Sequence, residues 1–155
     1  MKKIGFTIGK FAPFHKGHEY LIETALKETD ELYVVVYDTD VIDIPVETRA
    51  KWISDKYNNV KIIYAYGAPK QYGLDEKSVK IQMDYLAQKL DGIPVNCFFS
   101  SEPYGEKVAE YLGIENITVD QARKQVPISA RTIRNDLEKN KNFLDDKVYS
   151  EIKKI

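Results

Sequence analysis

The stretch IGKFAPFHKGH, residues 8–18, decides the fold of this chain. An apolar run leads into it and a segment with apolar residues at helical spacing follows it, so the pattern predicts a strand, a turn and a helix. We expect Gly9 to let the backbone turn sharply and a ligand approach closely, and Pro13 to stiffen the connection. Gly17 leaves space beside the start of the helix, and His18 falls in its first turn.

The two histidines of the chain, His15 and His18, flank this predicted helix start. The N-terminus of a helix presents free N–H groups and a partial positive charge, so it attracts anions. Two imidazoles there would add donors that follow negative charge as it moves between phosphate oxygens. The alternative is a pair of surface or helix-capping histidines without a binding role. The stretch shows no nucleophile paired with a base, and it lacks the cysteine or carboxylate partners that a zinc site needs.

Strand-like and helical segments alternate about five times along the chain. The strand-like runs are short, β-branched and aromatic, and apolar on both faces, as is typical of strands buried between helix layers. They cover Ile4–Ile8, Leu32–Tyr37, Val60–Tyr66, Val95–Ser100 and, more weakly, Ile117–Val119. The helical patterns cover residues 17–29, 45–57, 75–90 and 103–113, with further ones after residue 126. The alternation predicts an α/β fold, with a parallel sheet of about five strands, helices on both faces and a single domain over residues 1–155.

Three stretches have the least regular patterns, namely Asp38–Ile44, Gly67–Leu74 and Asp120–Pro127. Each follows a predicted strand, so all three should emerge at the carboxyl edge of the sheet. Ligands bind in the crevice at that edge in open α/β folds. We therefore expect these loops to carry recognition.

Composition narrows the class of protein. The chain has 155 residues and a net charge of −1, which argues against a general nucleic-acid binder. No apolar run is long enough to span a bilayer, and the N-terminal one is too short for a signal peptide. The single cysteine, Cys97, cannot form an internal disulfide, reads as a buried inert thiol and fits a reducing compartment. We expect a cytoplasmic enzyme or small-ligand binder with no nucleic-acid or membrane partner; a homo-oligomer is compatible with the sequence.

A second motif, VPISARTIRNDL at Val126–Leu137, repeats the logic of the first. Ser129 follows a predicted loop and begins a helical pattern, so it is a candidate N-cap. Arg131 and Arg134 lie in the next turn, with Thr132 between them. A capping hydroxyl and arginines at a helix start favour a second anion site. The alternative is an ordinary capped helix with arginines facing solvent.

Together the two motifs resemble the nucleotidylyltransferase superfamily, whose members share an H-x-G-H element and a C-terminal I-S-x-T-x-x-R-like element. More narrowly, the chain is similar to the nicotinamide-mononucleotide adenylyltransferase domain of the NadR type. Four stretches carry this resemblance, which runs from Lys3 to about Leu144: GKFAPFHKGHEYLI, DIPVETRAKWI, FFSSEPYGEKVAEYLG and VDQARKQVPISARTIR. It implies a Rossmann-like fold and an enzyme that joins ATP and nicotinamide mononucleotide to give NAD and pyrophosphate, with Mg²⁺ carried by ATP. The alternatives are another acceptor, such as pantetheine phosphate, a CTP-dependent reaction, or a non-catalytic nucleotide sensor.

The resemblance also implies roles for individual residues. Its ATP-binding set comprises Gly9, Lys10, Phe11, His15, Gly17, His18, Arg123, Ser129, Arg131, Thr132 and Arg134, of which Lys10, His15, His18 and Arg134 would serve catalysis. Many relatives have a hydroxyl residue where this chain has Arg131, so the residue that meets the phosphate, Arg131 or Thr132, stays open. Longer relatives carry a DNA-binding segment or a ribosylnicotinamide kinase domain; this chain has no room for either, and we expect both activities to be absent.

Candidates for binding the second substrate are Asp38, Arg49, Trp52, Ser101 and Tyr104. Trp52 could stack on a pyridine ring, but its helical spacing favours the core. Arg49 could contact a substrate phosphate or pair with a nearby carboxylate. Ser101 could bind adenine or ribose, or cap the next helix. Asp38 could meet a ribose or a metal-bound water, or simply form a turn, and Tyr104 could face substrate or packing.

Overall fold

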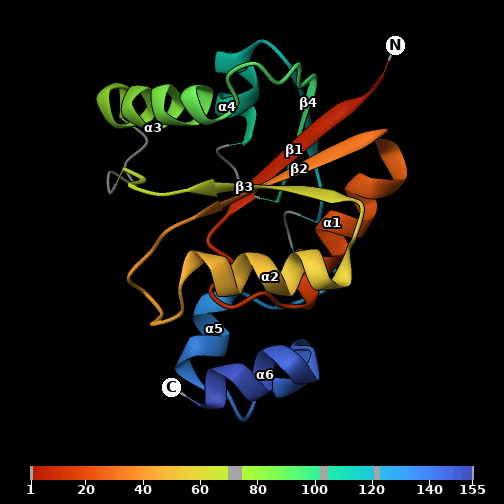
Figure 1. Ribbon diagram of the computed structural model, residues 1–155, viewed down its shortest axis with the longest axis vertical. Helices are drawn as coiled ribbons and strands as arrows, with labels where there is room; N and C mark the ends of the chain where they lie inside the picture. The colour runs from red at the N-terminus through yellow and green to blue at the C-terminus, as the bar shows by residue number, and fades with distance from the viewer. Residues whose placement is uncertain (1, 70–74, 102–104, 121–122, 155) are drawn as a thin grey trace.

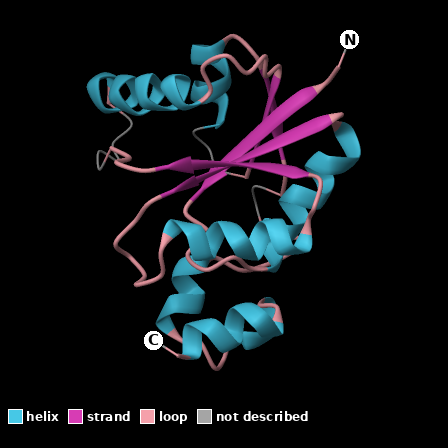
Figure 2. Ribbon diagram, viewed as in Figure 1, coloured by secondary structure: helices cyan, strands magenta, loops and turns pink. Residues whose placement is uncertain are grey.

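The computed structural model of the chain describes residues 2–69, 75–101, 105–120 and 123–154. Five parallel strands form one sheet in the order β3-β2-β1-β4-β5 (Figures 1 and 2). Their bounds are β1 Ile4–Gly9, β2 Glu31–Tyr37, β3 Val60–Ala65, β4 Cys97–Ser100 and β5 Glu115–Thr118. The prediction of a five-stranded parallel α/β fold is confirmed.

The described helices cover both faces of this sheet. Their bounds are α1 Lys16–Glu28, α2 Val46–Lys56, α3 Glu76–Lys89, α4 Gly105–Leu112, α5 Ala130–Asn135 and α6 Asp146–Lys153, with a 3-10 turn at Lys141–Phe143. In Figure 1, α3 and α4 lie on one side of the sheet, and α1, α2, α5 and α6 lie on the other. None of these helices has the length and apolar character that crossing a bilayer requires.

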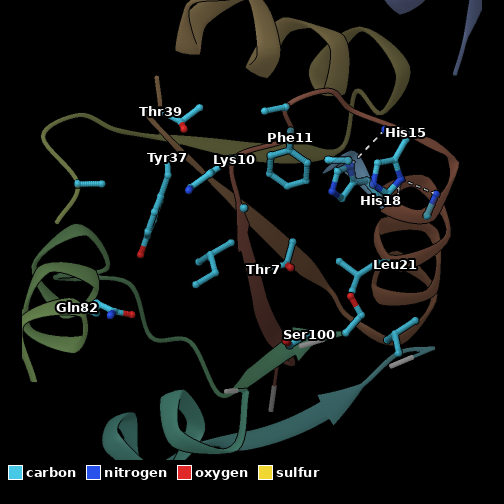
Figure 3. Close-up of a pocket in the computed structure, with 18 of the residues that line it drawn as sticks. Thr7, Lys10, Phe11, His15, His18, Leu21, Tyr37, Thr39, Gln82 and Ser100 are labelled. Atoms are coloured by element: carbon cyan, nitrogen blue, oxygen red, sulfur yellow. Dashed lines mark hydrogen bonds between the residues drawn. The ribbon is translucent and has the colours of Figure 1, made fainter. Parts of the chain in front are cut away.

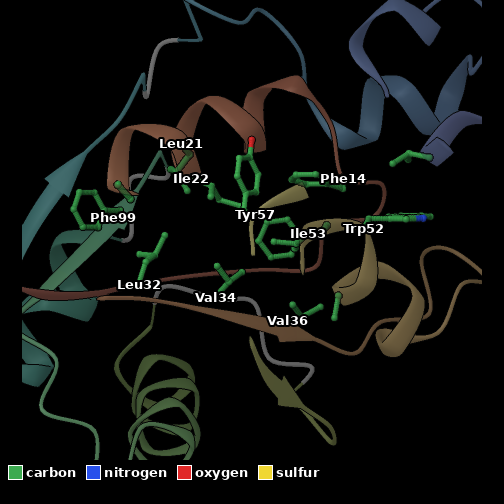
Figure 4. Close-up of a cluster of buried hydrophobic side chains, with 14 of the residues drawn as sticks. Phe14, Leu21, Ile22, Leu32, Val34, Val36, Trp52, Ile53, Tyr57 and Phe99 are labelled. Carbon is green, nitrogen blue, oxygen red and sulfur yellow. The ribbon is translucent and has the colours of Figure 1, made fainter. Parts of the chain in front are cut away.

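Two apolar clusters hold the layers together, and the alternation of side chains along β2 explains both. Leu32, Val34 and Val36 point to the larger cluster, which α1 and α2 cover, whereas Val35 joins the smaller one beneath α3 and α4 (Figure 4). All four side chains are fully buried. A buried side chain of this size stabilises the fold by about 1.5–3 kcal/mol, so these clusters supply much of the stability that fixes the sheet.

Local details differ from the sequence pattern at several element ends. Pro45 stands at the N-cap of α2 rather than inside its first turn. The C-cap of α3 is Leu90, and Gly92 follows it with φ of +81°. Gly113 just after α4 also has a positive φ, +68°, which glycine adopts readily, so the predicted end of that helix is confirmed. Pro103, expected at the start of the same helix, lies outside the described residues.

The strand order places a crevice at the carboxyl ends of β1 and β4. From β1 the chain adds β2 and then β3 on one side, and it then crosses over to add β4 and β5 on the other. The connections that leave β1 and β4 therefore diverge to opposite faces of the sheet. Such a point is where open α/β folds bind their ligands.

Candidate active site

A cavity of about 990 Å³ opens at this crevice (Figure 3). Its lining comes from the end of β1, the start of α1, one face of α3, the start of α5 and the loops after the other strands. Each of the three irregular stretches contributes, through Asp38–Asp40, through Gly67–Pro69, and through Asp120, Arg123 and Val126. The expectation that these loops surround a common crevice is thus confirmed for their described residues.

The two histidines cap the N-terminus of α1 through reciprocal hydrogen bonds. His15 is the N-cap, and its Nδ1 accepts hydrogen bonds from the backbone N–H groups of Gly17 at 3.0 Å and His18 at 3.3 Å. His18 returns the bond, because its Nδ1 accepts from the backbone N–H of His15 at 3.2 Å. The two rings stack with their centroids 3.7 Å apart. This is a capping box in which imidazoles replace the usual hydroxyl and carboxylate.

These bonds fix the chemical state of both rings. A nitrogen that accepts a hydrogen bond carries no proton, so in the neutral ring the proton must sit on Nε2. Burial, reinforced by the charge of Arg123, lowers the pKa of His15 to about 3. Burial also lowers the pKa of His18 well below its ordinary value, and the neighbouring His15 and Arg123 add to the effect. Both side chains line the cavity, so the site holds two neutral imidazoles whose remaining donor is Nε2–H.

Gly17 is required because the ring of His15 lies over it. A Cβ built at Gly17 would stand 2.8 Å from Cε1 and 3.0 Å from Nδ1 of His15. The space that the sequence pattern predicted beside the helix start is therefore present, and the capping ring occupies it.

The sharp turn after β1 is made by Phe11 and not, as the sequence pattern predicted, by Gly9. Gly9 is the last residue of β1 and pairs with Val36, whereas Phe11 has a φ of +49°. Gly9 instead leaves room for the Phe11 ring, which a Cβ there would meet at 3.2 Å. That ring packs edge-on against His18 with centroids 4.8 Å apart. Gly9, Lys10 and Phe11 all line the cavity, and Figure 3 shows the Lys10 side chain extending into it.

The second motif reaches the same loop from the far end of the chain. Arg134 on α5 donates from Nη1 to the backbone carbonyl of Ala12 at 2.7 Å, across 122 residues of sequence. Arg123, with φ of +54°, donates from Nη1 to the carbonyl of Ile128 at 2.7 Å and so orders the loop that leads to α5. Both arginines line the cavity. The two motifs therefore meet at one site.

The start of α5 contributes less to the cavity than its motif implied. Ser129 is the N-cap, as predicted, and its Oγ accepts from the backbone N–H of Thr132 at 3.2 Å. The two hydroxyls also lie 2.8 Å apart, within hydrogen-bond distance of each other. Ala130 lines the cavity, whereas Ser129, Arg131 and Thr132 do not. These three hydroxyl and guanidinium groups thus stand beside the cavity rather than in its wall.

Arg49 is a buried brace and not a cavity residue. Its guanidinium is held by three backbone carbonyls, those of Ile44 at 3.0 Å, Tyr37 at 2.8 Å and Lys10. The side chain is 1% exposed, and burial lowers its pKa even though the charges of Asp38 and Glu47 oppose this. Neither predicted role, a phosphate contact or an ion pair, is the one observed. The Arg49 guanidinium instead joins the loop after β1 to the end of β2.

Trp52 packs in the larger core cluster, which corrects its place among the substrate-binding candidates (Figure 4). It is 3% exposed, lies outside the cavity lining, and donates from Nε1 to the carboxylate of Glu151 on α6. Asp38 and Ser101 do line the cavity. The Asp38 carboxylate accepts from the backbone N–H groups of Gly67 at 2.7 Å and Ala68 at 3.1 Å, and so ties two of the recognition loops together. Tyr104 lies outside the described residues.

Several polar cavity residues were not singled out as site candidates by the sequence reasoning, although some of them lie within the quoted motif stretches. They are Thr7, Tyr20, Tyr37, Thr39, Asp40, Gln82, Lys107 and Asp120. Thr7 could have been found, because it is a polar residue near the end of an apolar strand. Its side chain is almost completely buried, as is that of Ser100, which also lines the cavity. Gln82 and Tyr37 face the cavity from the side opposite the histidines (Figure 3). The Tyr37 ring also packs edge-on against Tyr85, with centroids 5.8 Å apart.

Among the described lining residues, cations and carboxylates are both present. The cations are Lys10, Lys107, Arg123 and Arg134, and the carboxylates are Asp38, Asp40 and Asp120. The Asp120 carboxylate accepts backbone N–H bonds from residues 124–126, which lower its pKa, so it shapes the loop that carries Arg123. Within residues 2–69, 75–101, 105–120 and 123–154, no group of three or more His, Cys, Asp or Glu side chains is arranged to hold a metal ion.

Known proteins share this architecture and parts of this sequence. The family described as the citrate lyase ligase C-terminal domain matches residues 5–73. The trifunctional NAD biosynthesis/regulator proteins NadR of Salmonella typhimurium and Escherichia coli are each 32% identical to the chain, over 87% of this chain and 37% of theirs. The resemblance to the nucleotidylyltransferase superfamily is confirmed. The chain spans little more than a third of the length of these curated relatives.

Solved structures with similar folds include a NadR protein and an NMN adenylyltransferase. A NadR protein in complex with NAD and AMP-PNP superposes with a TM-score of 0.65 at 22% identity, over 92% of this chain and 44% of that one. A bifunctional NMN adenylyltransferase/ADP ribose pyrophosphatase from Francisella tularensis gives 0.71 at 18% identity, over 99% of this chain and 49% of that one. The complex of that enzyme with AMP and a manganese ion gives 0.58 at 17% identity, over 98% and 52%. The chain therefore shares the Rossmann-like fold of these proteins.

Proposed function

We propose that the protein is an adenylyltransferase that joins ATP and nicotinamide mononucleotide to give NAD and pyrophosphate. An oxygen of the acceptor's monophosphate attacks the α-phosphorus of ATP in line. The bond from the α-phosphorus to the bridging oxygen breaks, and pyrophosphate leaves with the electron pair. No protein nucleophile is needed, so the protein contributes positioning and stabilisation of charge.

The observation that carries this proposal is the pair of neutral imidazoles at the N-terminus of α1, in a chain similar to NadR. Their Nδ1 atoms are committed to the helix cap, which leaves one Nε2–H donor on each ring for phosphate oxygens. Charge that develops on those oxygens in the transition state strengthens such bonds, whereas a neutral ring avoids trapping the product as a tight ion pair. Arg123 and Arg134 supply the positive charge nearby.

The two sides of the cavity divide the substrates between them. ATP would lie with its triphosphate along the loop after β1, between His18 and Arg134, with Lys10 beside the reacting phosphate. The acceptor would enter on the side of Tyr37 and Gln82, where an aromatic ring and an amide face the cavity. The divalent ion, Mg²⁺, would arrive bound to the phosphates of ATP as part of the substrate. The cytoplasmic location expected from the sequence belongs to the same proposal.

One assay decides the acceptor. The purified protein is mixed with ATP, Mg²⁺ and one acceptor at a time, and pyrophosphate release is measured. Nicotinamide mononucleotide, nicotinate mononucleotide, pantetheine phosphate, and an alcohol phosphate with CTP form the panel. Release with nicotinamide mononucleotide alone supports the proposal. Release with a different acceptor moves the protein to another transferase of the same fold, and ATP binding without release with any acceptor indicates a nucleotide sensor.

A second assay tests the histidines. If Nε2–H of His18 stabilises charge only as it develops, His18→Ala should lower kcat by about 10²–10³ while ATP affinity changes far less. Equal losses in kcat and in ATP affinity would show that the imidazole holds only the ground state. Tyr111→Phe removes an exposed hydroxyl that is bonded to Asp84, and neither residue lines the cavity. This variant is the control and should leave both values unchanged.

A further inference from the structure

Four charged side chains meet beneath the start of α1, outside the cavity. Lys16 Nζ lies 2.6 Å from Asp145 Oδ1 and 3.6 Å from Glu19 Oε1. Lys56, the last residue of α2, lies 3.1 Å from Glu19 Oε1 and 3.2 Å from Asp145 Oδ2. None of the four lines the cavity. This cluster of Lys16, Glu19, Lys56 and Asp145 joins α1, α2 and the residue that precedes α6.

Two features of the cluster are unfavourable for the fold alone. Asp145 occupies the N-cap position of α6, yet its side chain makes no capping hydrogen bond and instead binds the two lysines. Glu19 is buried, its Oε2 has no hydrogen-bond partner, and burial raises the pKa of its carboxyl against the bond from Lys56, which lowers it. Buried carboxylates of this kind are weak contributors to stability. The arrangement therefore calls for a reason besides stability.

The cluster is one step away from the histidine pair. Lys16 stands between His15 and Gly17 in the sequence, and the backbone N–H of Glu19 donates to the carbonyl of His15 at 3.0 Å. Both imidazoles are also fixed to the first turn of α1, because their Nδ1 atoms accept hydrogen bonds from backbone N–H groups there. A displacement of the first turn of α1 would thus move both Nε2–H donors as one body.

We propose that Asp145 and Lys16 are positioning residues for the histidine pair. Their ion pair holds the first turn of α1 in place, so that the Nε2–H groups of both imidazoles stay directed into the cavity. The inference rests on the proposed function for its kinetic effect. It gives the segment around Asp145, which is far from the two histidines in the sequence, a part in the proposed reaction. Figure 1 shows α6 on the same side of the sheet as α1 and α2, where such a link is possible.

A double-mutant cycle tests the proposal. Asp145→Asn and Lys16→Met are made singly and together, and kcat/KM for pyrophosphate release is measured with ATP and nicotinamide mononucleotide. Because a small misplacement of reacting groups carries a large kinetic penalty, we expect each single variant to lose about tenfold or more. The double variant should lose clearly less than the product of the two single losses, because both single variants remove the Lys16–Asp145 contact. Independent, multiplying losses would overturn the proposal.

Lys147→Met is the matched control. Lys147 on α6 pairs with Asp55 on α2. Its substitution therefore removes an ion pair between α6 and α2 and leaves the contacts of α1 in place. Urea unfolding of every variant measures stability separately. We expect Lys147→Met to keep the wild-type rate. If it loses as much activity as Asp145→Asn, or if the losses simply follow the urea midpoints, the cluster is structural and the proposal is wrong.

Amide hydrogen exchange gives a readout that does not depend on turnover. The backbone N–H groups of Gly17 and His18 both donate to His15 Nδ1, so a loosened turn should exchange these two amides faster. We expect faster exchange in Asp145→Asn and not in Lys147→Met; unchanged exchange in Asp145→Asn would refute the positioning role. If the wild-type protein releases no pyrophosphate with any acceptor, the proposed function fails, and this comparison still decides whether Asp145 holds the turn.

Discussion

Substitution of Gly17 by alanine isolates the catalytic use of the capping box from its structural use. The added methyl group would stand 2.8 Å from Cε1 and 3.0 Å from Nδ1 of His15, closer than side-chain carbons are found to approach. The other neighbour, Cγ2 of Ile128, would be at an ordinary 3.7 Å. The methyl group therefore fits only if the imidazole of His15 swings away, and the backbone, already helical at this position, has no need to move.

The two consequences of that swing differ greatly in size. The ring gives up the bonds it accepts from Gly17 and His18, and loss of an N-cap destabilises a protein by about 1 kcal/mol. Alanine favours the helix over glycine by up to about 1 kcal/mol, so the two terms offset each other. The free energy of unfolding should change by less than about 1 kcal/mol. The rate, in contrast, should fall by about 10²–10³, the usual penalty for losing one donor aimed at developing charge.

Pyrophosphate release under turnover and urea unfolding of the same preparation check both values. Gly113→Ala is the inverse control, because Gly113 has a φ of +68° with open space around it, outside the cavity. There we expect a loss of about 1–2 kcal/mol in stability and no loss in rate. A Gly17→Ala protein that turns over at the wild-type rate would refute the claim that the His15 ring must lie over Gly17. A stability loss of several kcal/mol would show that the box is mainly structural.

Three further predictions follow from the site. His15 binds a proton more readily in the unfolded chain than in the folded protein, because folding lowers its pKa to about 3. The free energy of unfolding should therefore fall as the pH drops from about 6.5 toward 3, by up to about 1.4 kcal/mol per pH unit. The urea midpoint of His15→Asn, which keeps a capping acceptor, should depend less on pH. Trp52→Phe should lower stability by about 1–2 kcal/mol and leave the KM for nicotinamide mononucleotide unchanged, whereas a raised KM would restore a stacking role. Arg49→Lys keeps the charge but loses the fork that binds three carbonyls, so stability should fall by about 2 kcal/mol or more and kcat/KM with it; a wild-type thermal midpoint would contradict the bracing role.

The architecture could be predicted from the sequence because its causes are local or follow general topological rules. Strands such as β2 carry long β-branched runs, and helices such as α1 have apolar faces that read directly from spacing. The presence of His18 and Arg134 in the wall of one cavity could also be predicted, since loops that follow parallel strands emerge at one edge. Their separation in sequence is large, but the rule that joins them needs only the order of the elements.

Roles set by single contacts between distant residues could not be predicted. The carbonyls that hold Arg49 belong to Lys10, Tyr37 and Ile44, and nothing in the sequence marks a carbonyl as an acceptor for a given side chain. The sequence pattern predicts the turn after β1 at Gly9, because glycine tolerates a positive φ, yet Phe11 adopts it. In this conformation the Phe11 ring packs edge-on against His18, a contact between side chains that the sequence pattern does not indicate.

The same reasoning explains why the acceptor is harder to derive than the nucleotide. The residues proposed to face the triphosphate come from two short motifs, each of which begins a helix with a capping side chain. Residues on the other side of the cavity come one at a time from separate elements: Tyr37 ends β2, Gln82 lies on α3, and Gly67 begins the loop after β3. No shared motif joins these positions in the sequence, so no single pattern indicates what they bind. Under the proposed function, specificity for the acceptor depends on these separate positions, and turnover with competing acceptors measures it.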